Sequence, residues 1–201
     1  MTVKLYVEGG GDHDKSLATA CRRGFSEYLR KAGLAGQMPR IIVCGARSLA
    51  FRDFEKAIRD AGDLAVLLVD SETEVLSTPW EHVANRPGDL WKKPALATDN
   101  QLHFMTQCME AWFYCDKDAI AAFYKRGFRV GKLSKHVDIE KISKQDLFEG
   151  LKQATKECQK GEYAKGGHSF QILAMIDPKK VREASKSADR LLTHLALINP
   201  N

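Results

Sequence analysis

Two short apolar runs that each end in acidic residues constrain this chain more than any other feature. Residues 3–7 (VKLYV) lead into Glu8, and residues 64–69 (LAVLLV) lead into Asp70. Both runs have the length of a buried strand and are too short for a long helix. Parallel strands of an open α/β sheet bring their carboxyl ends to one edge, so these acids can meet there. Carboxylates that meet repel one another unless a cation joins them, and the pattern therefore predicts a site for Mg²⁺ or Mn²⁺.

The composition is that of a folded protein with a weak preference for polyanions. A chain of 201 residues with 44% hydrophobic residues can bury one substantial core. The formal net charge of +5 suits a nucleic-acid partner, but the lysines and arginines are spread among acids and form no long tail. The five cysteines contain no Cys-x-x-Cys pair, which favours reduced thiols over a disulfide framework or a zinc ribbon. Without a signal sequence or a membrane-length apolar run, we expect a cytoplasmic protein with no membrane association.

The order of the predicted elements is that of a doubly wound α/β sheet. Strand, helix, strand, helix and strand follow one another up to Asp70, and the carboxyl-terminal part is helical and more polar. We expect an α/β domain over residues 1–125, with an irregular insertion at 73–100, and a helical region over 126–201 packed on the same core. The predicted strands are 3–7, 40–44, 64–69 and 102–105, and the predicted helices are a first one ending near Gly33, then 48–61, 109–124, 144–158, 169–175, 178–185 and 188–197.

Glu8 is the first candidate functional residue. It lies at a predicted strand end beside three glycines, where backbone, ion and ligand can approach closely. The alternative is an acid that only neutralises the dipole of the following helix, but Asp12 and Asp14 are nearer to that helix. Asp12 itself is balanced between helix capping and metal ligation.

Three further acids are candidate metal ligands. Asp70 and Glu72 are two residues apart, and in extended backbone such side chains point to the same side. Glu110 lies in the apolar segment 109–113 (MEAWF), where a buried acid needs a partner. That partner is either a metal ion or an arginine that Glu110 orients.

Several basic residues next to predicted strand-end loops are candidates for gripping a phosphate backbone. Lys165 and His168 flank two glycines in a turn where the lysine can bind phosphate and the histidine can bind phosphate or shuttle a proton. The alternative for this turn is a solvated loop, and for the arginines on the first helix it is an ordinary solvated helix face. The remaining candidates for phosphate contact are Lys15, Arg22, Arg23 and Arg47.

Two common catalytic patterns are excluded. The turn at residues 9–16 joins a strand to a helix and contains Lys-Ser, but Asp14 stands before Lys15 where a P-loop has glycine. No Gly-x-Ser-x-Gly sequence supports acyl transfer through a nucleophilic serine.

The acidic motifs resemble those of a known fold. Residues 7–9 (VEG) with Asp12, followed by residues 68–72 (LVDSE), resemble the TOPRIM fold of topoisomerases, bacterial primases and OLD-family nucleases. In that fold a strand-end Glu and a later Asp-x-Asp bind Mg²⁺; here Glu72 replaces the second Asp. The whole chain is also similar to a family of small bacterial TOPRIM-like proteins often encoded beside ABC- or AAA-type ATPases in phage-defence loci. The segments that carry this likeness are 21–25 (CRRGF), 109–113 (MEAWF), 168–173 (HSFQIL) and 176–178 (IDP).

The resemblance implies a metal-dependent nuclease acting on DNA or RNA, in phage defence, with an ATPase partner. Glu8 would serve as general acid or base, and Asp70 and Glu72 would hold the metal. The longer side chain of Glu72 leaves the number of metal ions open, and self-association is left open as well. The alternative is a non-catalytic regulatory subunit whose insertion around Trp80 and Trp91 docks the ATPase.

Overall fold

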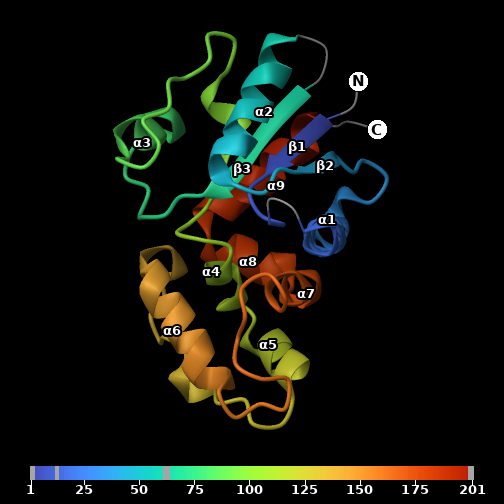
Figure 1. Ribbon diagram of the computed structural model, residues 1–201, viewed down its shortest axis with the longest axis vertical. Helices are drawn as coiled ribbons and strands as arrows, with labels where there is room; N and C mark the ends of the chain where they lie inside the picture. The colour runs from blue at the N-terminus through green and yellow to red at the C-terminus, as the bar shows by residue number, and fades with distance from the viewer. Residues whose placement is uncertain (1–2, 12–13, 61–63, 199–201) are drawn as a thin grey trace.

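A parallel sheet of four strands forms the centre of the molecule (Figure 1). The computed structural model describes residues 3–11, 14–60 and 64–198. The strands lie in the spatial order β2-β1-β3-β4, and every neighbouring pair is parallel. This arrangement confirms the predicted α/β class. The strand bounds are β1 Val3–Val7, β2 Arg40–Val43, β3 Leu64–Asp70 and β4 Leu102–Met105.

Both faces of the sheet are covered, which explains why its strands are apolar almost throughout. On one face, Leu5 belongs to a hydrophobic cluster that includes Phe25 of α1 (Lys15–Leu29). On the other, Tyr6 belongs to a second cluster with Phe54 of α2 (Arg47–Arg59).

The connections place a topological switch point between β1 and β3. From β1 the chain leads through α1 to β2 on one side, whereas from β3 it leads to β4 on the other side. The crevice beyond the carboxyl ends of two such strands is where open α/β sheets usually bind ligands. Glu8 directly follows β1 and Asp70 ends β3, so the fold brings both acids to that crevice.

The predicted irregular insertion contains a helix, α3 (Pro79–Asn85). Thr78 and Glu81 form a capping box at its start, and Pro79 occupies the first helical turn, where proline is tolerated. Trp80 is buried and donates a hydrogen bond from its indole N–H to the carbonyl oxygen of Thr98, 3.0 Å away. The prediction of irregular structure was therefore wrong for residues 79–85, where proline stands at the start of a helix and does not interrupt it.

The predicted helix over 109–124 is two helices, α4 (Glu110–Phe113) and α5 (Lys117–Tyr124). Asp116 separates them, because its side chain accepts a hydrogen bond from the N–H of Ala119 and so caps α5. Asp116 also accepts a hydrogen bond from the N–H of Asp177, which fixes the break against the carboxyl-terminal region.

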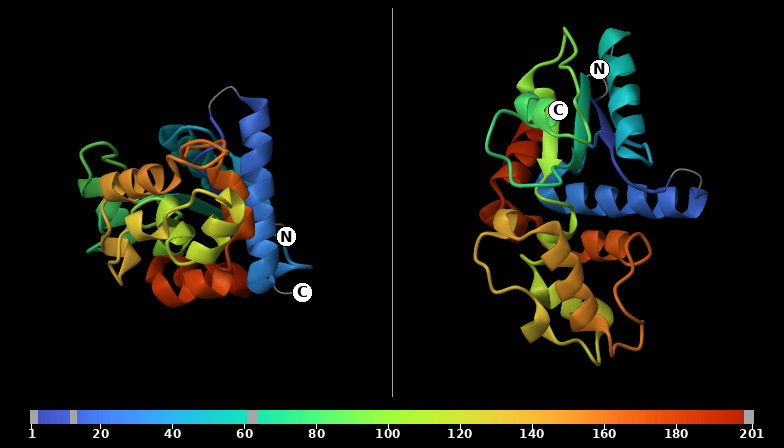
Figure 2. Two further views of the ribbon diagram at one scale, coloured as in Figure 1. Left: turned by 90° about the horizontal axis from the view of Figure 1, so that it is seen from below. Right: turned by 60° about the vertical axis from the view of Figure 1, so that its left-hand side comes forward.

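The carboxyl-terminal region is helical, as predicted, and shares a core with the sheet. One hydrophobic cluster contains Leu5 of β1, Trp112 of α4 and Leu173 of α7 (Ser169–Met175). Figure 2 shows α1 lying across the molecule between the sheet part and the helices beyond it. The helices of this region are α6 Lys144–Thr155, α7 Ser169–Met175, α8 Pro178–Ala184 and α9 Lys186–Ile198. Short turns of other helical types are a π-helical turn at Arg30–Leu34 and 3₁₀ turns at Asp99–Gln101, Val130–Lys132 and Ile139–Lys141.

All five cysteines lie among the described residues, and all are free thiols. Over the described ranges, no helix combines the length and the apolar character that crossing a membrane requires.

Candidate metal centre

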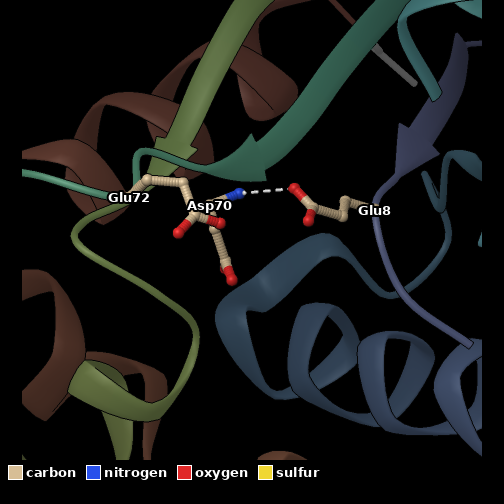
Figure 3. A group of neighbouring side chains, drawn as sticks. All are labelled: Glu8, Asp70 and Glu72. Carbon is tan, nitrogen blue, oxygen red and sulfur yellow. Dashed lines mark hydrogen bonds between the residues drawn. The ribbon is translucent and has the colours of Figure 1, made fainter. Parts of the chain in front are cut away.

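Three carboxylates converge at the carboxyl ends of β1 and β3 (Figure 3). One oxygen from each of Glu8, Asp70 and Glu72 lies within 4.8 Å of the others. The strand ends are held in register, since the N–H of Glu8 donates to the carbonyl oxygen of Leu68 at 3.1 Å. The N–H of Asp70 donates in turn to Oε2 of Glu8 at 3.2 Å. We call these three residues the acidic cluster; hard oxygen ligands at this spacing could hold a metal ion.

Glu72 reaches the acidic cluster by a different route from the predicted one. Its backbone is not extended but has a φ of +68°, in the left-handed region that non-glycine residues seldom adopt. Its N–H donates to the carbonyl oxygen of Gln107 at 2.8 Å, which holds this turn in place. The prediction of extended backbone was wrong, although the carboxylate does join Asp70.

Asp70 is the most buried acid of the cluster, with 4% of its surface exposed. The N–H of Met109 donates to its Oδ1 at 3.0 Å. Burial, followed by the charges of Glu8 and Glu110, raises the pKa of Asp70 to about 7. An acid in these surroundings is stabilised in its charged form by a nearby cation, so the cluster fits a bound divalent ion.

Lys144 already supplies one positive charge to the acidic cluster. Its Nζ lies 2.7 and 2.8 Å from the two carboxylate oxygens of Glu72 and 3.5 Å from Oδ2 of Asp70. Partial burial acts to raise the pKa of Glu72, but the hydrogen bonds and charge of Lys144 outweigh it and hold that pKa below its usual value. Nothing in the sequence near Lys144 marks it, because it is simply the first residue of a helix far along the chain.

Arg47 orients the acidic cluster. Its Nη1 donates to Oε2 of Glu8 at 3.2 Å and to the carbonyl oxygen of Asp70. Its Nε and Nη2 donate to the two oxygens of Asp89, each at 2.7 Å, and its guanidinium lies over the ring of Trp91, 4.8 Å from the centroid. Four of the five N–H donors of this guanidinium are thus engaged within the protein, which makes Arg47 a positioning group, and its predicted phosphate contact stays a prediction.

Glu110 is fully buried, and only one of its two carboxylate oxygens has a hydrogen-bond partner among the described residues. Its Oε1 accepts a hydrogen bond from the hydroxyl of Tyr163 at 2.7 Å, whereas its Oε2 has no hydrogen-bond partner among the described residues. Of the two predicted alternatives, the arginine partner was wrong, because Tyr163 takes that place. A buried oxygen without a partner is costly, so the metal-ligand alternative stays a prediction.

A cavity of about 270 Å³ adjoins the acidic cluster. The glycines after Glu8 form part of its wall, and Gly10 must be glycine because a Cβ there would lie 2.3 Å from Cγ1 of Val43. Among the other lining side chains, polar and charged groups slightly outnumber apolar ones. They are Glu8, Leu17, Asp70, Met105, Met109, Glu110, Lys165, Ser169 and Phe170.

The two residues of the predicted phosphate turn are placed differently. Lys165 lines the cavity, and its Nζ lies 4.0 Å from Oδ2 of Asp70, with 57% of its side chain exposed. His168 is turned away toward α5, where its Nδ1 is hydrogen-bonded to the hydroxyl of Tyr124 at 2.8 Å and its ring packs on Phe123. Burial, with a smaller effect from Lys160, lowers the pKa of His168. The prediction that His168 faces the metal edge was therefore wrong.

The other predicted basic contacts lie on the exposed surface of α1, away from the cavity lining. Lys15 is the first residue of that helix, and Arg22 and Arg23 are exposed. Of these, Arg23 borders a separate hollow of about 640 Å³ between α1 and α7. Asp12, the fifth predicted metal ligand, lies outside the described residues.

Comparison with known proteins places this site within a protein family. No curated protein and no solved structure matches the chain. A family model described as a domain of unknown function, DUF4276, matches residues 7–196. The match spans the acidic cluster, Arg47, Lys144 and the cavity. The chain therefore belongs to the DUF4276 family.

Proposed function

We propose that this protein is a divalent-metal-dependent nuclease that hydrolyses phosphodiester bonds in DNA or RNA. The observation that carries the proposal is the convergence of Glu8, Asp70 and Glu72 at the switch point of the sheet. A cavity and the ammonium group of Lys165 lie directly beside them. Acids that hold a metal beside an exposed lysine suit a substrate that is itself an anion.

The residues of the cluster divide into ligands and supports. Glu8, Asp70 and Glu72 would hold Mg²⁺ or Mn²⁺, and the bound ion would neutralise the scissile phosphate. Arg47 and the N–H of Asp70 both bind Oε2 of Glu8, which orients this carboxylate for proton transfer. Lys165, at the rim of the cavity, would contact a non-bridging phosphate oxygen.

The biological setting is part of the same proposal. The TOPRIM-like motifs of the sequence support a cytoplasmic phage-defence effector that works with an ABC- or AAA-type ATPase. The non-catalytic regulatory subunit remains the rival hypothesis, since an acidic cluster neutralised by Lys144 could also serve to hold the structure together.

Removal of divalent ions tests the proposal. Cleavage of plasmid, single-stranded DNA and tRNA should be lost in EDTA and restored by excess Mg²⁺ or Mn²⁺, because the metal is expected to neutralise the scissile phosphate. The assay measures substrate lost per unit time, with the companion ATPase present where one is encoded beside the gene. Cleavage that persists in EDTA would rule out a metal-dependent nuclease. Absence of cleavage under every condition would favour the regulatory subunit.

A further inference from the structure

Lys144 occupies the position that a divalent cation would need in the acidic cluster. Its ammonium group is within 2.8 Å of both oxygens of Glu72 and is 3.5 Å from Asp70. We propose that Lys144 is a built-in counter-cation that stabilises the metal-free cluster and must leave Glu72 when a divalent ion binds. This inference rests on the proposed function, because it concerns the same metal site.

The distances explain why the two cations exclude each other. A divalent ion of the Mg²⁺ type binds carboxylate oxygens at about 2.1 Å. An ammonium group that keeps both oxygens of Glu72 at hydrogen-bond distance would then lie no more than about 5 Å from the ion, because one oxygen would be shared by both cations. Two positive charges so close in a partly buried site repel strongly, so only one of them can be held by Glu72 at a time.

The side chain of Lys144 is able to leave while its backbone stays in place. Ser143 caps α6 by accepting a hydrogen bond from the N–H of Asp146 at 3.1 Å, which fixes the start of the helix independently of the ion pair. The side chain of Lys144 is 27% exposed, so a rotation about its flexible stem carries the ammonium into solvent.

The ion pair also joins two parts of the molecule. Glu72 follows the sheet, whereas Lys144 begins α6, which lies apart from the sheet among the lower helices in Figure 1. Metal binding would exchange this link for a metal–carboxylate bond. Lys144 and the metal ion would compete for the carboxylate of Glu72. By thermodynamic linkage, the ion pair weakens metal binding to the same extent that metal binding weakens the ion pair.

Titration of the metal-free protein with Mn²⁺ in a calorimeter tests the proposal. The Lys144→Met variant should bind Mn²⁺ about tenfold more tightly than the wild type, because its site has no resident cation. Lys144→Arg retains the charge and should bind with wild-type affinity. Lys141→Met is the matched control, since Lys141 is exposed three residues earlier, and its affinity should change by no more than about twofold.

Thermal unfolding supplies a second reading that does not depend on activity. In EDTA, Lys144→Met should unfold about 3 °C below the wild type, because its three carboxylates repel one another. Saturating Mn²⁺ should remove or reverse that difference. Lys144→Gln replaces the Met variant if the latter does not fold.

The outcomes separate this inference from the proposed function. Absence of Mn²⁺ binding in both the wild type and Lys144→Met would overturn both. Mn²⁺ binding with equal or weaker affinity in Lys144→Met would overturn only the counter-cation and leave the metal site standing. Tighter Mn²⁺ binding by Lys144→Met, together with the loss or reversal of its lower melting temperature in saturating Mn²⁺, supports the exchange of Lys144 for the metal ion.

Discussion

Replacing Glu8 by Gln is expected to slow cleavage of nucleic acid by about 10³-fold while leaving the protein folded. Glutamine keeps the shape of the side chain and can still accept the hydrogen bond from the N–H of Asp70. It loses the negative charge and the ability to transfer a proton. Arg47 keeps its bonds to Asp89 and to the carbonyl oxygen of Asp70, so the structural cost should be only about 1 kcal/mol.

The role of Glu8 is tested by comparing the initial cleavage rates of the wild type and the variant. Both are measured with Mg²⁺ and with any companion ATPase present. Glu74→Gln is the matched control, because Glu74 is an exposed acid close in sequence to the cluster but outside it. It should cleave at the wild-type rate. If Glu8→Gln cleaves at the wild-type rate, Glu8 takes no part in cleavage, and the hypothesis of a non-catalytic regulatory subunit is favoured.

Replacing Arg47 by Met is expected to lower the free energy of unfolding by about 3 kcal/mol and the melting temperature by about 9 °C. Arg47 is 12% exposed and joins Glu8, the carbonyl oxygen of Asp70 and the side chain of Asp89. Its loss leaves the buried Asp89 with Arg86 as its remaining ion-pair partner, at 2.9 Å. Removing one member of a buried ion pair is costly because the other charge stays desolvated.

Chemical unfolding of Arg47→Met beside Arg52→Met measures this effect. Arg52 lies on the same helix, is 67% exposed and pairs only with its neighbour Asp53 among the ion pairs of the described residues. Its replacement should change the free energy of unfolding by no more than about 0.5 kcal/mol. Equal losses in the two variants would show that Arg47 is an ordinary surface residue and would contradict its positioning role.

The sheet could be predicted from the sequence because local signals and tertiary structure agree there. The run 64–69 is apolar on every residue, as a strand covered on both faces must be, and its carboxyl end falls at Asp70. Once β1 and β3 are parallel neighbours, the meeting of Glu8 and Asp70 follows from the direction of the strands. These predictions needed no knowledge of distant side chains.

Other parts of the site depend on tertiary contacts that leave no local pattern. Lys144 reaches Glu72 only because α6 begins beside the turn that follows β3, and nothing in the residues around it indicates this. The role of Arg47 depends on Asp89, which arrives from the insertion. His168 was predicted to face the metal because of its neighbours in sequence, but the fold turns its ring toward Tyr124.

Anomalous diffraction from a crystal of the protein soaked in Mn²⁺ would locate the metal directly. We expect an anomalous peak at the end of β1 and β3, with oxygens of Glu8, Asp70 and Glu72 about 2.1 Å from it. We also expect Nζ of Lys144 to have moved away from Glu72. The absence of a peak at the acidic cluster, at Mn²⁺ concentrations that support cleavage, would show that these carboxylates do not form the metal site.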